Sequence, residues 1–83
     1  MTTIHNESFA DLEPATLYAL LRLRVDVFVV EQRAAYPELD GRDLEPGTRH
    51  LWVTRSDPAQ PLAYLRLLAE PDGTMRIGRV VTA

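Results

Sequence analysis

The spacing of hydrophobic positions changes once along the chain, and this change predicts a helix followed by strands. From Pro14 to about Val30, apolar residues recur at intervals of three and four, which is typical of an amphipathic helix. From His50 onward, apolar residues alternate with polar ones or run together between turn residues, which is typical of β-strands. We therefore predict an α+β fold in which the helix packs on one face of an antiparallel sheet.

The predicted helix begins at Pro14, because proline is tolerated in the first helical turn and the acidic residues before it suit the positive end of the helix dipole. Arg22 and Asp26 lie on the polar side as an i,i+4 pair. The apolar face is formed by Leu17, Leu20, Leu21 and Phe28. By propensity alone, residues 25–30 would also suit a strand.

Two charged residues, Arg24 and Glu31, interrupt this apolar face. They could form a partly buried pair, or reach the next loop, and hold the helix in place. Alternatively, they could line a cleft and contact a substrate. The pattern favours the structural role.

Strands are predicted on both sides of the helix. Residues 3–9 form a weakly patterned first strand, and residues 50–55, 62–70 and 75–83 form a meander joined by short turns. Ile77, Val80 and Val81 predict that the last strand is buried. Strands that are apolar on both faces also predict a sheet covered on its second side by something outside this chain.

The segment from residue 33 to 49 is predicted to be a loop, and it carries four carboxylates within eight residues: Glu38, Asp40, Asp43 and Glu45. The alternation of aspartates and the terminal glutamate of a calcium-binding loop are absent, so we predict no metal site. The cluster could be a solvated surface, or a cleft that attracts a cationic amine.

Size and composition narrow the function classes. The 83 residues can form one domain or part of one, and the net charge of -3 gives no support for nucleic-acid binding. The absence of cysteine excludes disulfides and a thiol nucleophile. The start of the chain has no signal-peptide pattern and no apolar run is long enough for a bilayer, so we expect a cytoplasmic protein without membrane contact.

Several motifs resemble the ElaA-like branch of the GNAT-type N-acetyltransferase superfamily. The motifs are Leu-Tyr-x-Leu-Leu-x-Leu-Arg-x-x-Val-Phe-Val-Val-Glu-Gln at 17–32, Tyr36-Pro37, Asp40-Gly41, Asp43, Arg49-His50, Ala63-Tyr64-x-Arg66 and Ile77-Gly78-Arg79-Val80. Where relatives often have Cys-Pro, this chain has Ala34-Ala35. The resemblance covers the N-terminal half of the family's fold, and the R/Q-x-x-G-x-G/A turn that follows the fourth strand is absent. It thus implies that residues 1–83 are a single partial domain that stops before the pyrophosphate-binding turn.

The resemblance implies direct transfer of an acetyl group from acetyl-CoA to a small or peptidic amine, without a covalent enzyme intermediate. In such enzymes the pantetheine arm lies along the fourth strand, so the backbone of Val80, Val81 and Thr82 would contact the cofactor. A strand amide would polarise the thioester carbonyl. The pyrophosphate would bind at the start of a helix beyond Ala83.

The same resemblance suggests the acid–base and substrate residues. An ammonium group has no lone pair, so a base is needed, and the candidates are Glu31 and His50. His50 has a structural alternative as a hydrogen-bonded strand-end residue. The residues expected on the substrate side are Arg24, Glu38, Asp40 and Asp43.

Two alternatives to an enzyme stay open at this stage. The chain could be a non-catalytic interaction module that uses an open sheet edge to recruit a partner strand. It could also be a fragment that is inactive without the C-terminal half of the domain. A homodimer is a further arrangement that the sequence allows.

Overall fold

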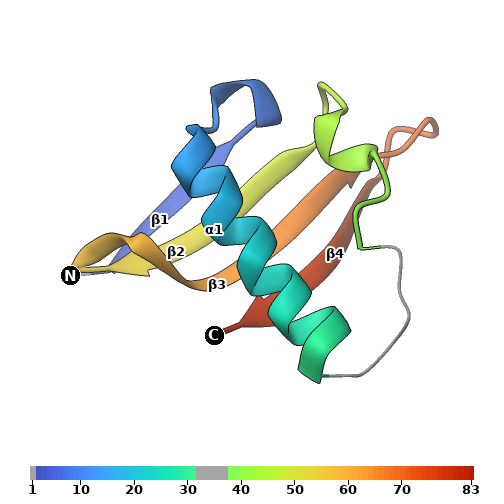
Figure 1. Cartoon of the computed structure of the whole chain (residues 1–83). Helices are drawn as coiled ribbons and strands as arrows, with labels where there is room; N and C mark the ends of the chain where they lie inside the picture. Colours follow the sequence, from blue (N-terminus) through green and yellow to red (C-terminus); the bar gives the residue numbers. More distant parts are fainter. Residues whose placement is uncertain (1, 32–37) are drawn as a thin grey trace.

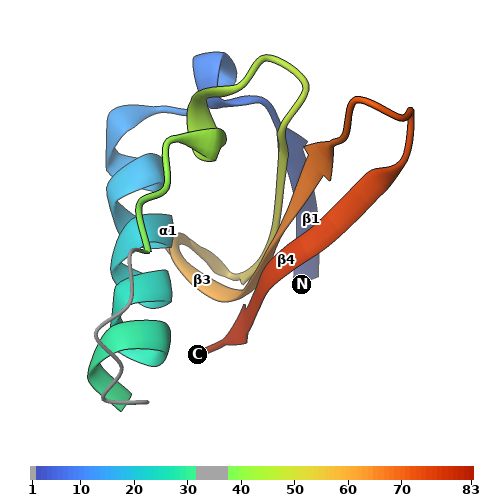
Figure 2. The same ribbon diagram turned by 90° about the vertical axis from the view of Figure 1, so that its right-hand side faces the viewer.

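The computed structural model describes residues 2–31 and 38–83, except for the side chains of residues 31 and 57–59. Four strands form a single antiparallel sheet in the order β1-β2-β3-β4, and α1 crosses one face of it (Figures 1 and 2). This arrangement confirms the predicted α+β fold. The main elements are β1 (Thr2–Glu7), α1 (Pro14–Val25), β2 (Arg49–Arg55), β3 (Asp57–Ala69) and β4 (Met75–Thr82).

The helical segment begins with Pro14 after the extended N-cap residue Glu13, as the sequence predicts. After Val25 it continues as a π-helical segment, Asp26–Glu31, so the strand alternative for residues 25–30 is wrong. The exposed Arg22–Asp26 pair is present, with 3.9 Å between Nε and Oδ2. No helix within residues 2–31 and 38–83 is both long and apolar enough to span a membrane.

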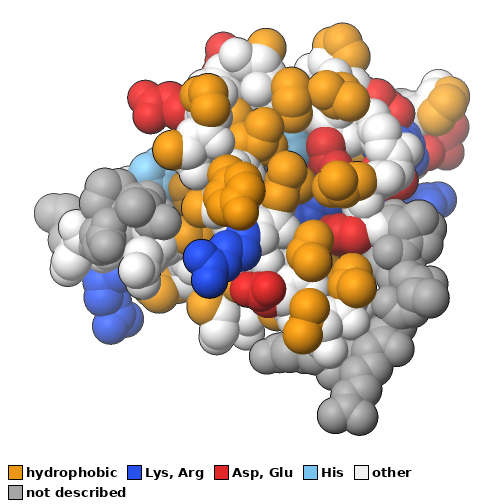
Figure 3. All heavy atoms as spheres, in the orientation of Figure 1, with side chains coloured by type: hydrophobic (Ala, Val, Ile, Leu, Met, Phe, Trp, Pro, Cys, Tyr) orange, Lys and Arg blue, Asp and Glu red, His pale blue; other side chains and the backbone are white. Residues whose placement is uncertain are grey.

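The face that α1 buries is rotated from the predicted one. Leu20 and Arg24 are its buried residues, whereas the predicted Leu17 and Leu21 are half-buried. Arg24 can be buried on this face because the carboxylates of Glu38 and Asp43 neutralise its charge. Figure 3 shows apolar side chains gathered on the helix side of the molecule. Tyr18 of α1 is 72% exposed.

The core lies between α1 and the inner face of the sheet. Trp52 of β2 and Tyr64 of β3 stand opposite each other in the register and pack with Leu20 and Val81. On the outer face, Leu51 lies opposite Leu65, and both are half-buried. One side of the sheet is therefore a packed core, and the other is an apolar surface that the described residues leave uncovered.

The final strand is not buried as the sequence predicted. In β4, Val81 is 4% exposed, but Ile77 and Val80 are 63% and 62% exposed. The reason is topological, since β4 is an edge strand and its outer face carries no layer from the described residues (Figure 2). The β-branched composition identified the strand correctly but not its environment.

Candidate functional site

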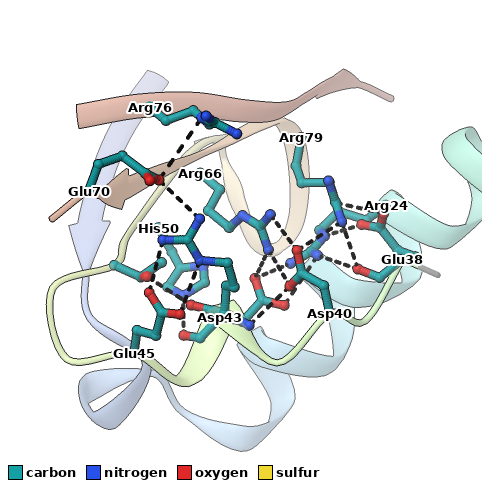
Figure 4. Close-up of polar contacts among 12 residues, drawn as sticks. Arg24, Glu38, Asp40, Asp43, Glu45, His50, Arg66, Glu70, Arg76 and Arg79 are labelled. Atoms are coloured by element: carbon teal, nitrogen blue, oxygen red, sulfur yellow. Dashed lines mark hydrogen bonds and ion pairs between the residues drawn. The ribbon is translucent and has the colours of Figure 1, made fainter. Parts of the chain in front are cut away.

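Three arginines and three carboxylates form a cluster between α1, β3, β4 and the loop that precedes β2 (Figure 4). We call it the charged network and the loop of residues 38–48 the acidic loop. The formal charges of the charged network cancel. Its members are Arg24, Arg66, Arg79, Glu38, Asp40 and Asp43.

Arg24, from the buried face of α1, is at the centre of the charged network and is only 1% exposed. Its Nε lies 2.5 Å from Oε1 of Glu38, and its Nη1 lies 2.7 Å from Oδ1 of Asp43. Burial alone would lower the pKa of Arg24, but the hydrogen bonds and charges of these carboxylates outweigh burial, so its pKa lies above the ordinary value. The structural alternative, in which Arg24 reaches the next loop, is therefore what the geometry shows.

Arg66 attaches the acidic loop to β3. Its two terminal nitrogens form a fork to the carboxylate of Asp40, with distances of 2.9 Å each, and Nη1 also donates to Asp43. The hydrogen bond from Arg66 is the main reason that the pKa of Asp40 falls to about 2. The pKa of Asp43 is also lowered, because the hydrogen bonds and charges of Arg24 and Arg66 outweigh the opposing effect of burial.

Arg79 attaches the acidic loop to β4. Its Nε lies 2.8 Å from Oε2 of Glu38, and its Nη2 lies 3.2 Å from Oδ2 of Asp40. Its backbone has a φ of 53°, in the left-handed region that non-glycine residues rarely adopt. Each of the three arginines thus binds the same loop from a different element.

His50 lies beside the charged network with its ring almost fully buried. Its Nε2 is 3.1 Å from the Asp43 carbonyl, which only accepts, so Nε2 carries the proton. Its Nδ1 therefore accepts from the hydroxyl of Tyr64, 2.6 Å away. Burial lowers the pKa of His50 below its ordinary value and raises that of Tyr64 to about 12.

The structure brings several of the predicted site residues together. Arg24 and the three carboxylates share the charged network, and His50 contacts Asp43. Glu38 and Asp43 are 4% and 7% exposed, so the prediction of a solvated acidic surface is wrong for these two residues. The side chain of Glu31 lies outside the described residues. No group of metal-ligating residues is found within the described ranges.

The sequence did not identify Arg66, Arg79 and Tyr64 as site residues. Arg66 carried a signal, because it is the single charged residue in the otherwise apolar run from Leu62 to Ala69. Arg79 belongs to the motif Ile77-Gly78-Arg79-Val80, but the sequence did not indicate its ion pairs, because they depend on how β4 pairs with β3.

That pairing contains a bulge. Tyr64 pairs with Val81 and Arg66 with Gly78, so the single residue between them on β3 opposes both Arg79 and Val80. Beyond the bulge, the amide of Ala83 donates to the Leu62 carbonyl at 2.8 Å. Because backbone groups alternate sides along a strand, the N–H and C=O of Thr82 point to the outer edge of β4, which we call its free edge because no strand among the described residues pairs with it.

The outer face of the sheet is hollowed beside this bulge. We call this depression the outer hollow, and its volume is about 210 Å³. It is lined from all four strands, including Leu65 of β3 and the predicted cofactor residues Val80, Val81 and Thr82. The predicted cofactor strand thus combines a free edge with an adjacent apolar depression.

Known structures resemble the chain along its whole length. An acyl-CoA N-acyltransferase from Pseudomonas aeruginosa is 48% identical with a TM-score of 0.89, and this chain covers 57% of it. Escherichia coli ElaA is 36% identical with a TM-score of 0.90, and this chain covers 56% of it. In both cases 100% of the present chain is matched, which confirms the resemblance to the N-terminal half of the GNAT fold.

Sequence relatives give the same result. A UPF0039 protein of Mycobacterium tuberculosis is 52% identical over 75 residues, which are 87% of this chain and 47% of the relative. E. coli ElaA is 41% identical over 76 residues, which are 89% of this chain and 48% of the relative. The chain therefore spans about half the length of these relatives. No protein-family model matches it.

Proposed function

We propose that this chain, which matches the N-terminal half of an ElaA-like GNAT acyltransferase in sequence and fold, supplies the acyl-CoA strand and the acceptor side of an N-acetyltransferase. The reaction would transfer acetyl from acetyl-CoA to a small or peptidic amine. The observation that carries the proposal is β4, an edge strand with a bulge, a free backbone edge and an apolar hollow beside it.

The free edge of β4 suits a pantetheine arm. Pantetheine contains amide groups, and an extended chain with amides can pair with an exposed strand as an additional strand would. Thr82, whose N–H and C=O point away from β3, would make these backbone contacts, with Val80 and Val81 in the lining of the outer hollow beside it. An amide N–H aimed at the thioester carbonyl would stabilise the oxyanion that forms when the amine attacks.

The chemistry requires a neutral amine. A base removes a proton from the ammonium, and the amine nitrogen bonds to the thioester carbon. The C–S bond then breaks, and the CoA thiolate takes up the second proton that the attacking nitrogen loses as the amide forms. Glu31 and His50 are the proposed bases. Since both ring nitrogens of His50 are hydrogen-bonded within the protein, His50 would first have to give up a partner, and Glu31 is the candidate to test first.

The acceptor side is proposed to include the acidic loop. Of its three network carboxylates, Asp40 is the most accessible, with 28% of its side chain exposed, so it would meet an incoming ammonium. Arg24, Glu38 and Asp43 are buried and paired, so they would shape the wall behind Asp40.

A second candidate function is an interaction module. The exposed side chains of Ile77 and Val80 on the outer face, next to the free edge of β4, favour it because such a surface also suits a partner strand or layer.

Enzyme assays separate the two functions. The protein encoded by the whole reading frame around these 83 residues is incubated with acetyl-CoA and polyamine, lysine or N-terminal peptide amines, and thiol release is followed. The proposal expects saturable, amine-dependent release, and a turn of the form R/Q-x-x-G-x-G/A within about ten residues after Ala83. If the reading frame lacks that turn and the protein releases no thiol, the proposed acetyltransferase activity is contradicted and the interaction module is the function that remains.

The Glu31 assignment has its own test. Glu31→Gln is expected to lower the rate and remove the acidic limb of the pH–rate profile, where protonation of Glu31 would stop it from acting as a base, while the exposed Glu13→Gln leaves the profile as it is. An unchanged profile in Glu31→Gln would exclude it as the base.

A further inference from the structure

The bulge of β4 places an arginine where the backbone would favour glycine. Arg79 has a φ of 53°, and left-handed backbone is unfavourable for a residue with a bulky side chain. Gly78, directly before it, has no such φ. The strained position therefore belongs to a residue whose side chain offsets the cost.

The Arg79 side chain is fixed by the acidic loop. It is only 13% exposed, with Nε 2.8 Å from Glu38 and Nη2 3.2 Å from both the Glu38 carbonyl and the Asp40 carboxylate. A guanidinium held this way restricts the backbone that carries it, because a shift of the bulge would separate buried opposite charges.

The partners of Arg79 are themselves anchored. Glu38 is held by Arg24 of α1, and Asp40 by the fork from Arg66 of β3. The bulge is consequently connected to the helix and to its neighbouring strand, and does not depend on strand pairing alone.

We infer that Arg79 is a positioning residue: its ion pairs with Glu38 and Asp40 hold the bulge, and so set where the backbone of Val80–Thr82 meets the acyl thioester. This role rests on the proposed function. It also links the two sides of the reaction, because the loop proposed to receive the amine holds the strand proposed to polarise the thioester.

The test uses three substitutions of Arg79 in the whole protein. Arg79→Met removes the charge and keeps most of the stem, Arg79→Gly also relaxes the left-handed backbone, and Arg79→Lys keeps the charge without the fork. Arg76→Met is the control, because Arg76 is on the same strand but 69% exposed and 4.0 Å from its partner.

Two measurements are made on each variant. In thiol release, Arg79→Met and Arg79→Gly are both expected to lower kcat about tenfold or more with a smaller change in the KM for acetyl-CoA, and Arg79→Lys recovers part of the loss. In NMR hydrogen exchange, the amides of Val81 and Ala83, which face β3, are expected to exchange about tenfold faster in Arg79→Met.

Each outcome decides the inference. Wild-type kcat in Arg79→Gly would overturn it, because relaxing the backbone would then suffice without the ion pairs. Unchanged hydrogen exchange at Val81 and Ala83 in Arg79→Met would show that the ion pairs of Arg79 do not hold the bulge. This result would overturn the inference whether or not the protein consumes acetyl-CoA. A wild-type protein without acetyl-CoA turnover would overturn the proposed function, and the catalytic part of this inference with it.

Discussion

Arg24 and Asp43 form a two-pronged ion pair between α1 and the acidic loop, with Nη1 2.7 Å from Oδ1 and Nη2 3.2 Å from Oδ2. Both side chains are almost fully buried, at 1% and 9% exposed. A buried pair of this kind contributes little net stability compared with an apolar pair, but the loss of one partner leaves a buried charge uncompensated.

The first prediction concerns Arg24. Arg24→Met should lower the free energy of unfolding by about 3–5 kcal/mol, because it leaves Glu38 and Asp43 without their main buried cation. Urea denaturation followed by circular dichroism measures the change. Arg22→Met is the matched control on the same helix, with its side chain 74% exposed, and should stay within about 0.5 kcal/mol. Equal effects of the two substitutions would show that the pairs around Arg24 do not matter.

The second prediction concerns the stability of the fold at low pH. The pKa of Asp40 is about 2 in the folded protein against an ordinary 3.8, so its stabilising effect is full above about pH 4 and is lost as the pH falls toward 2. With solvent screening, the effect is on the order of 1 kcal/mol. Asp40→Asn should therefore flatten the loss of stability between pH 5 and pH 2, as measured by urea titrations at each pH. An acid slope that is as steep in Asp40→Asn as in the wild type would refute this.

The third prediction concerns the proton on His50. The ring should be neutral with its proton on Nε2, which long-range nitrogen–proton NMR spectra distinguish directly. Tyr64→Phe removes the hydroxyl that donates to Nδ1 and should cost about 1–3 kcal/mol of unfolding free energy. A proton found on Nδ1 in the wild type would contradict the assignment, because His50 would then donate to the Tyr64 hydroxyl and Nε2 could no longer donate to the Asp43 carbonyl.

The fourth prediction compares two glycines. An added Cβ at Gly47 would lie 3.0 Å from Cβ of Ala69, which is fixed to the backbone of β3, so Gly47→Ala should destabilise by about 1–3 kcal/mol. An added Cβ at Gly78 meets nothing within 4 Å, so Gly78→Ala should be neutral or stabilise by up to about 1 kcal/mol. Thermal unfolding of both variants and the wild type measures the order of their stabilities. A Gly78→Ala protein that is less stable than Gly47→Ala would contradict the prediction.

The sequence predicted the order of elements because their signals are local. The Pro14 helix start, the acidic residues before it and the turns between strands depend on neighbouring residues only. Burial was predicted less well. Ile77 and Val80 have the composition of a buried strand, yet their exposure depends on which strand lies at the edge and what covers it.

The candidate site was predicted in part for a similar reason. Arg24 was identifiable as a charge on an apolar helix face, and the carboxylates as a cluster. Their pairing with Arg66 and Arg79 depends on strand register and on a bulge, which no local pattern encodes. The roles of Glu31, His50 and the strand end in catalysis stay predictions.

The charged network also constrains how this sequence can change over time. Since Asp43 serves both Arg24 and Arg66, and Glu38 serves both Arg24 and Arg79, replacing any one of these leaves two neighbours unbalanced. Descendants of this chain should therefore keep the set intact or replace several members together with apolar residues. Covariation, rather than gradual substitution, is the evolutionary signature that this arrangement of charges should leave.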